Sequence, residues 1–339
     1  MSSINCSTPP QKENRKEFLF LSDESKKDKP WDTHRSASKV LASIFRGSEV
    51  PKLKKHAIRL DDCSPWLAFG IESNEKGEKR HKISQAFFCH VRTCPVCQWR
   101  RSLAHKARFL RAMPAILSRP ECRGAKFMFL TLTVRNCDVH ELRTTIQMMN
   151  DGWRRLHARL SKKPWLLGWV LSTEVTRSDS EEGNAHPHFH ILLMVKPSYF
   201  KGGNYITQSE WIAIWKQSAR LDYDPSVRIE LTKGHRSKRG VVKTALEASA
   251  SEVLKYATSF DEELLADPEW VIEYAQQIHA LKFVRTGGLF SGILKDDYTT
   301  DEMLQGEEEG EEQEDKPIPL EVVYWFSHAF NQYARPRKA

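Results

Sequence analysis

The sequence lacks any apolar run long enough to cross a membrane. No segment of its 339 residues approaches the roughly 18 consecutive apolar residues that a spanning helix requires. The first residues, MSSINCSTPPQKENRKEF, also lack the apolar core of a secretory signal peptide. We therefore expect neither a membrane span nor a secretory signal, and a cytoplasmic location.

The chain also lacks an internal repeat and a disulfide pattern. No period of about 20–50 residues recurs, which excludes a solenoid. The seven cysteines are an odd number, and three of them lie between residues 89 and 97. This crowding favours metal binding in a reducing compartment over a disulfide framework.

The charge balance is basic. Lys and Arg number 52 against 44 Asp and Glu, a formal net charge of +8. Part of the acidic charge is concentrated in GEEEGEEQED (306–315), so the rest of the chain is more basic than the total indicates. This balance favours a polyanionic partner.

Periodicity and composition indicate an α+β fold with a central antiparallel sheet and flanking helices, preceded by a small zinc-containing module. Strands are expected at 126–136, 166–177, 186–195 and 226–232, and helices at 98–117, 139–160, 207–220, 244–260 and 267–282. The expected segments are a mostly flexible N-terminal arm (1–59), a zinc-binding module with a basic helix (60–118), a catalytic domain (119–262) and a helical C-terminal extension with an acidic linker (263–339, linker 306–315).

The stretch NAHPHFHILLMV (184–195) places three histidines before a buried strand. Alternate side chains of a strand share a face, so His188 and His190 point the same way. If the preceding turn closes near Glu181, Glu174 lies opposite His188. Two histidines and a carboxylate with open positions form a site for a catalytic divalent metal. His186 is the rival third ligand, and the simpler interpretation is strand-end histidines bonded to the backbone or to each other.

The helix expected at 244–260 brings Glu252 and Tyr256 together, because residues four apart are neighbours on a helix. In the structural interpretation, Tyr256 borders the core and Glu252 is a solvated charge. In the functional one, Tyr256 is a nucleophile towards phosphorus and Glu252 is a general base for water.

Cys89, Cys94 and Cys97 form a C-x4-C-x2-C pattern, and Cys63 lies upstream. Four such thiolates favour a closed, structural zinc site that stabilises a small module. His81 or His90 could replace one ligand. The alternative is a set of buried free thiols.

Two basic stretches are candidates for DNA contacts. The helix after the cysteines carries Arg100 and Arg101, followed by Lys106, Arg108 and Arg111. The loop KGHRSKRG (233–240) carries Arg236, Lys238 and Arg239. Either stretch could instead be a solvated surface.

The order of these motifs resembles that of the rolling-circle plasmid replication initiators (Rep), members of the HUH endonuclease superfamily. The matching stretches are FLTLTVRN, HPHFHILLMVKPSYF and SEVLKYATS, with FFCHVRTCPVCQWRRS (87–102) similar to the cysteine motif of one branch. The resemblance runs from about Cys63 to Tyr256, more than half of the chain.

The resemblance implies a metal-dependent single-strand DNA endonuclease (nickase) and strand transferase. His188 and His190, with Glu174, would ligate Mg²⁺ or Mn²⁺, and Tyr256 would attack the scissile phosphate. The products would be a 5′-phosphotyrosyl protein and a free 3′-hydroxyl primer, with Glu252 activating water in the closing step. Relatives often carry a lysine three residues after the tyrosine, where this chain has Ser259; Lys255 precedes the tyrosine instead and is a candidate DNA contact.

The implied function is nicking and rejoining at a plasmid origin, at the start and end of rolling-circle replication. The implied partners are single-stranded and supercoiled origin DNA with a host helicase and polymerase. A transposase or relaxase would use the same chemistry. A non-catalytic, zinc-containing nucleic-acid-binding regulator is the alternative of another class, in which the histidines are structural.

Overall fold

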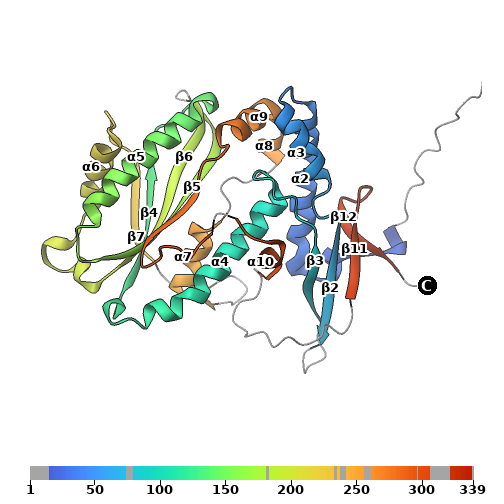
Figure 1. The fold of residues 1–339 in the computed structure, drawn as a ribbon, viewed down its shortest axis with the longest axis horizontal. Coiled ribbons are helices and arrows are strands. Elements are labelled where there is room, and N and C mark those ends of the chain that lie inside the picture. Colours follow the sequence, from blue (N-terminus) through green and yellow to red (C-terminus); the bar gives the residue numbers. More distant parts are fainter. Residues whose placement is uncertain are drawn as a thin grey trace, which may run out of the picture.

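The computed structural model contains two five-stranded sheets and a short two-stranded ladder (Figure 1). It describes residues 15–73, 79–180, 183–232, 235–236, 242–255, 260, 262–295, 297–305 and 321–337. Tyr256, Lys238, Arg239 and the acidic linker 306–315 lie outside the described residues, as does the side chain of Arg236. No described helix is both long and apolar enough to span a membrane.

The elements follow the sequence prediction closely between residues 95 and 231. The helices are α1 (Leu21–Glu24), α2 (Lys29–Gly47), α3 (Pro51–Asp61), α4 (Pro95–Leu117), α5 (Leu142–Leu160), α6 (Gln208–Ala219), α7 (Ala245–Val253), α8 (Glu262–Leu265), α9 (Pro268–Gln277) and α10 (Thr300–Gln305). The strands are β1 (Phe18–Phe20), β2 (Trp66–Ser73), β3 (Lys79–Ala86), β4 (Lys126–Thr133), β5 (Leu166–Ser180), β6 (Gly183–Val195), β7 (Val227–Leu231), β8 (His235–Arg236), β9 (Val242–Lys243), β10 (Val284–Gly288), β11 (Glu321–Ser327) and β12 (Gln332–Pro336).

The sheet that carries the histidines has the order β10-β5-β6-β4-β7, and all its neighbouring pairs are antiparallel. The predicted α+β fold with a central antiparallel sheet is therefore confirmed. Strand β10 was not predicted, because it was included in a helical extension. It can pass close to β5 because residue 287 is glycine, where a Cβ would lie 2.4 Å from the ring of Trp169.

Helices cover both faces of this sheet (Figure 1). On one face α5 and α6 bury a core that includes Trp153, Trp215 and Phe189. On the other face α4 and α7 pack against alternate residues of β5 and β6, including Leu192 and Met194. Because side chains of β6 alternate between faces, His188 and His190 lie on this second face, which α7 covers.

The second sheet has the order β1-β12-β11-β2-β3 and lies beside α2 and α3 (Figure 1). The expectation that residues 1–59 are mostly a flexible arm is wrong for the part that forms α2 and α3. Helix α2 buries Trp31, Leu41 and Phe45. Its apolar stripe is interrupted by Arg35, which is itself buried and donates to the carbonyls of Leu60 and Asp61, and this interruption hid the helical period.

The expectation of a helical C-terminal extension is also wrong in part. Strand β11 pairs with β2, and β12 joins β11 to the short β1. One core cluster contains Leu41 of α2, Cys63 and Tyr333 of β12. The cysteine region is therefore part of a larger unit built from both ends of the chain, and not a small module limited to residues 60–118.

Helix α7 is shorter than predicted. It begins at a capping box in which the side chains of Thr244 and Glu247 bond to each other's backbone N–H. It ends at Val253, where the prediction extended it to residue 260. Glu252 is in the last turn of the helix, and Lys255 follows it.

Candidate active site

The hairpin of β5 and β6 has the register that the sequence predicted. Glu174 pairs with His188, and Ser172 pairs with His190. Strand β4 pairs with β6 on the other side and places Thr131 opposite His190. Since the side-chain period of a strand is two residues, this register brings the carboxylate of Glu174 to the same face as both imidazoles.

Glu174, His188 and His190 converge on one point. The Oε2 atom of Glu174 lies 2.7 Å from Nε2 of His190 and 3.2 Å from Nε2 of His188. One ligand atom from each of the three residues lies within 4.8 Å of the others. Both histidines are about nine-tenths buried, so the group is sheltered by protein. This donor set could hold a metal ion.

The outer ring nitrogens of the two histidines also have partners. Nδ1 of His188 lies 3.3 Å from the carbonyl oxygen of His186, and Nδ1 of His190 lies 3.4 Å from the hydroxyl of Thr131. Each ring has two neutral tautomers. With Nε2–H, both rings donate to the Glu174 carboxylate. With Nδ1–H donating outward instead, the Nε2 lone pairs would face that carboxylate, and a cation between them would stabilise this second arrangement. The residues present therefore fit a divalent ion. The sequence analysis did not identify Thr131, because nothing in a Thr-rich strand distinguishes one threonine from another.

His186, the rival third ligand, is not in this group. Its Nδ1 lies 2.6 Å from Oδ1 of Asn136, and its ring packs at 5.2 Å from that of His188. Burial and the nearby charge of His188 lower the pKa of His186. The structure thus groups Glu174, and not His186, with the histidine pair.

Lys255 links the end of α7 to the candidate metal-binding group, as we call Glu174, His188 and His190. Its Nζ lies 3.1 Å from Oε2 of Glu174 and 3.0 Å from Oε1 of Glu252. Although burial alone would raise it, the pKa of Glu174 is well below its usual range, because His188 and His190 donate to it and Lys255 lies nearby. Burial opposes the charged form of Lys255, but the two carboxylates raise its pKa overall.

A groove of about 660 Å³ opens beside this group. It is lined by β4, β7 and α7, with contributions from Phe129, His190, Arg228 and Glu252. The ring of Phe129 lies 5.3 Å from that of His190. The groove therefore combines an aromatic surface, a cation and an open approach to the metal-binding group.

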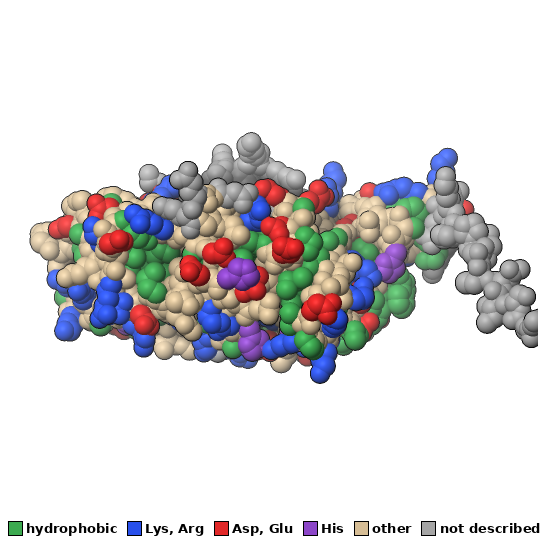
Figure 2. Space-filling model, turned by 90° about the horizontal axis from the view of Figure 1, so that it is seen from above, with side chains coloured by type: hydrophobic (Ala, Val, Ile, Leu, Met, Phe, Trp, Pro, Cys, Tyr) green, Lys and Arg blue, Asp and Glu red, His purple; other side chains and the backbone are tan. Residues whose placement is uncertain are grey.

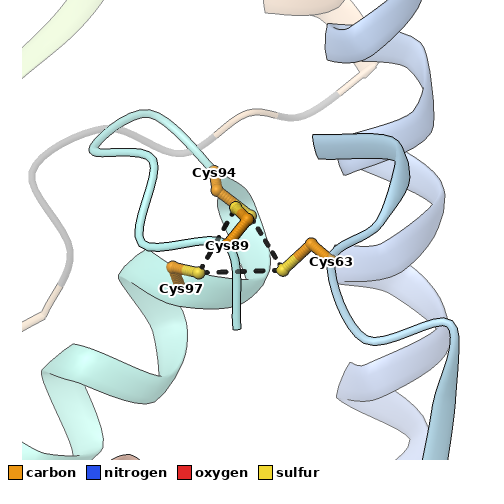
Figure 3. Close-up of side chains that lie close together, drawn as sticks. All are labelled: Cys63, Cys89, Cys94 and Cys97. Atoms are coloured by element: carbon orange, nitrogen blue, oxygen red, sulfur yellow. Dashed lines mark hydrogen bonds between the residues drawn. The ribbon is translucent and has the colours of Figure 1, made fainter. Parts of the chain in front are cut away.

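The four predicted cysteines form a second cluster, at the N-terminal end of α4. Figure 3 shows their side chains pointing toward one another from the end of α3, the loop after β3 and the start of α4. The sulfur of Cys63 lies 3.7 Å from that of Cys97 and 3.5 Å from that of Cys94, and the sulfur of Cys89 lies 3.7 Å from that of Cys97. A tetrahedron with metal–sulfur bonds of about 2.3 Å has edges of about 3.8 Å, so the thiols fit such a site.

All four cysteines are buried. Ser38 of α2 contributes its hydroxyl 3.5 Å from the sulfur of Cys94, a contact that the sequence analysis did not identify because it treated α2 as part of an arm. Burial opposes ionisation, but hydrogen bonds from the other three thiols and from Ser38 hold the pKa of Cys94 well below its usual value. The alternative ligands lie elsewhere: His81 packs against Phe69, and His90 faces Asp297.

Arg100 is not placed to contact DNA, contrary to the sequence prediction. The residue is fully buried, and its guanidinium donates to the carbonyls of Met303 and Leu304 in α10. The sequence of α4 does not indicate which of its basic residues face solvent, because this depends on which other elements pack against the helix. Helix α10 covers the side of α4 that carries Arg100. Arg101 is only partly buried and lies 3.8 Å from Asp297.

Comparison with known proteins gives a consistent result. Residues 80–334 match a family model described as "Replication protein". "Protein rep" of Lentilactobacillus hilgardii is 32% identical over 276 residues, which are 80% of this chain and 83% of that protein. "Protein rep" of Streptococcus pneumoniae serotype 2 (strain D39 / NCTC 7466) is 37% identical over 238 residues, 69% of this chain and 71% of that protein. "Protein rep" of Bacillus amyloliquefaciens is 38% identical over 214 residues, 61% of this chain and 60% of that protein. No solved structure matches the chain significantly.

Proposed function

Since the chain belongs to the replication protein (Rep) family, we propose that it initiates rolling-circle replication of a plasmid by nicking single-stranded DNA at the origin. The family is the one that the motif order predicted. The observation that carries the nicking proposal is the convergence of Glu174, His188 and His190 beside an open groove. This donor set leaves coordination positions for a substrate oxygen.

Glu174, His188 and His190 would hold Mg²⁺ or Mn²⁺. When bound, the ion supplies a Lewis acid that polarises the scissile phosphate. Thr131 and the carbonyl of His186 orient the two rings. Lys255, whose Nζ lies 3.1 Å from Glu174, would add a second positive charge beside the scissile phosphate and stabilise the negative charge that develops there.

Tyr256 is the proposed nucleophile. It directly follows Lys255 in the chain, and consecutive Cα atoms are about 3.8 Å apart, so it is tethered next to a residue that contacts Glu174. Its phenol oxygen bonds to phosphorus, the bond from phosphorus to the 3′ oxygen breaks, and the phenol proton passes to water. The 3′ oxygen takes a proton and becomes the free hydroxyl that primes synthesis, while the 5′ phosphate stays on the protein.

Glu252 is proposed as the general base of the closing step. Its side chain is about half exposed and lines the groove, so water can reach it. A carboxylate there can take a proton from water that attacks the phosphotyrosyl bond. This attack releases the DNA and regenerates the phenol.

The other predicted residues would stabilise the fold or bind the DNA backbone, and host proteins would extend the new strand. The four cysteines would hold Zn²⁺, because tetrahedral thiolate sites of this size are typical of structural zinc. Arg101 and the loop residues Arg236, Lys238 and Arg239 would contact the DNA backbone. A host helicase and polymerase would continue synthesis from the free 3′-hydroxyl.

The decisive experiment compares the wild-type protein with Tyr256→Phe on origin-derived single strands in the presence of Mn²⁺. Denaturing gels and mass spectrometry of the products should reveal a 5′-phosphotyrosyl adduct at Tyr256 in the wild type and none in the variant. Cleavage by Tyr256→Phe would identify another nucleophile. Tight binding by both proteins without cleavage or adduct would instead indicate a non-catalytic regulator.

A further inference from the structure

A second cavity lies on the other side of Lys255. It has a volume of about 410 Å³ and is bounded by the loop after β3 and helix α4 on one wall. Helix α9 and the start of β10 form the other wall. We call this cavity the cationic cleft, because its described lining residues include five Lys or Arg and one acid; the basic residues are Arg92, Arg101, Lys255, Lys282 and Lys295.

Against these five cations, the one acid that the described lining residues include is Asp297. Its side chain is 71% exposed and lies 3.8 Å from the nearest nitrogen of Arg101, so solvent weakens this ion pair. Lys295 is paired with Glu302 outside the lining. The guanidinium of Arg92 is held 4.8 Å above the ring of Phe283. The described lining therefore carries a net positive charge, and the ring of Phe283 holds one of its cations in place.

Arg101 supplies an independent sign of a ligand. Its Nε is buried, and none of the described residues accepts a hydrogen bond from it. A buried donor without an acceptor is unfavourable, whereas an oxygen of a bound anion would satisfy it. Arginine in particular matches the geometry of phosphate oxygens.

The cleft and the groove meet at the metal-binding group. Lys255 lines the cleft and contacts Glu174 and Glu252. Glu252 and His190 line the groove. A strand lying in the groove thus reaches the cleft by passing the metal-binding group and Lys255.

We propose that the cationic cleft binds the sugar-phosphate backbone on one side of the scissile phosphate, while the groove holds the other side. This inference rests on the proposed function and assigns a second half to its DNA site. A polynucleotide fits better than a free small anion, because the basic residues come from several separate segments along the cleft, as successive phosphates of one strand would require; Arg92 precedes α4, Arg101 is in α4 and Lys282 precedes β10. Figure 2 shows Lys and Arg side chains spread widely over the face in view, so surface charge alone does not mark a DNA path.

The test uses the double variant Arg101→Gln/Lys282→Gln and three single strands: a core around the nick site, the core extended on its 5′ side, and the core extended on its 3′ side. The matched control is Arg119→Gln/Arg123→Gln, which removes two exposed charges outside the cleft lining. Affinities are measured over a range of salt concentrations, and melting temperatures verify that each variant is folded. Lys282→Glu alone, in the loop before β10, replaces the double variant if that one does not fold.

In the wild type, we expect one of the two extensions to tighten binding more than the other. The cleft variant should lose that gain, and its plot of log affinity against log salt should become shallower by about 1.4, the value for two lost phosphate contacts on a single strand. The control should keep both the gain and the dependence of binding on strand side.

The outcomes separate the two proposals. If the cleft variant keeps the full gain from extension, the cleft assignment is wrong even when the protein nicks DNA. If the gain depends on Arg101 and Lys282 but no strand is ever cleaved, the cleft assignment stands and the nickase proposal fails.

Discussion

The described residues include two groups that could hold a metal, and the two differ in their surroundings. The thiol cluster has four candidate ligands, all buried, from the turn after α3, the loop after β3 and the start of α4, with Ser38 of α2 in contact with Cys94. The group of Glu174, His188 and His190 has three ligands on adjacent strands of one sheet and borders a groove. A closed site with four ligands stabilises a fold, whereas a site with an open side can exchange its remaining ligands with a substrate.

The largest expected effect is the loss of the thiol cluster. Cys94→Ser/Cys97→Ser should release zinc and unfold the unit around α2, α3 and α4, because a structural zinc site contributes roughly 10 kcal/mol, comparable to the whole stability of a domain. Metal analysis and thermal unfolding measure this. The control is Cys122→Ser, a buried cysteine outside the cluster. A metal-free variant with native unfolding would contradict a structural role.

Removing the histidine pair should have a large effect on activity and a small one on folding. His188→Ala/His190→Ala should lower Mn²⁺-dependent cleavage by at least about 100-fold, because the ligands of the proposed ion are gone. The melting temperature should change by only a few degrees, since both side chains lie at the border of the core. His186→Ala is the control. Cleavage at near wild-type rates by the pair variant would remove the metal site from the mechanism.

Chelation should distinguish the two groups without any substitution. EDTA at neutral pH should abolish cleavage quickly, and added Mn²⁺ should restore it, because His190 lines the groove, through which a chelator can approach the group. Zinc in the buried thiol cluster should stay bound on the same timescale. Metal content and cleavage are measured on the same samples. Simultaneous loss of zinc and activity, with recovery only by zinc, would reverse the assignment.

The next effect concerns product release. Glu252→Gln should slow hydrolysis of the phosphotyrosyl adduct by about 100-fold or more, the usual contribution of a general base, and should slow adduct formation much less. The ratio of adduct to released DNA over time is the measurement. The exposed Glu230→Gln, in the same groove, is the control. An unchanged ratio would assign the closing step to another group.

The smallest expected effect comes from the residue behind His190. Thr131→Val should lower the apparent Mn²⁺ affinity by about 10-fold, since partners that orient a ligand typically contribute 10–100-fold. Thr133→Val is a matched control on the same strand, because the hydroxyl of Thr133 donates to the carbonyl of Ser226 instead. Equal effects of the two substitutions would indicate a general loss of packing.

Local patterns predicted much of the sheet and its site. The alternation of β6 placed His188 and His190 on one face, and the length of the turn predicted the pairing of Glu174 with His188 that the structure contains. The spacing of the cysteines likewise predicted the cluster, including Cys63. These predictions succeeded because a strand period and a hairpin register depend on residues close in the chain.

Contacts between distant segments could not be predicted in this way. The burial of Arg100 depends on α10, more than 200 residues away in the chain. Helix α2 was missed because Arg35 and Ser38 lie on its buried face, and both find partners only in the folded protein.

The sequence by itself determined which residues of strand β6 share a face and how the cysteines are spaced, and thereby the candidate ligands of both groups, with His186, His81 and His90 left open as alternatives. Only the tertiary structure decided that both ends of the chain enclose the thiol cluster, that Lys255 links two carboxylates, and that α4, α9 and the start of β10 line one cleft. The physical reason is that backbone periodicity acts over a few residues, while burial and ion pairing depend on which distant segments compete for the same surface.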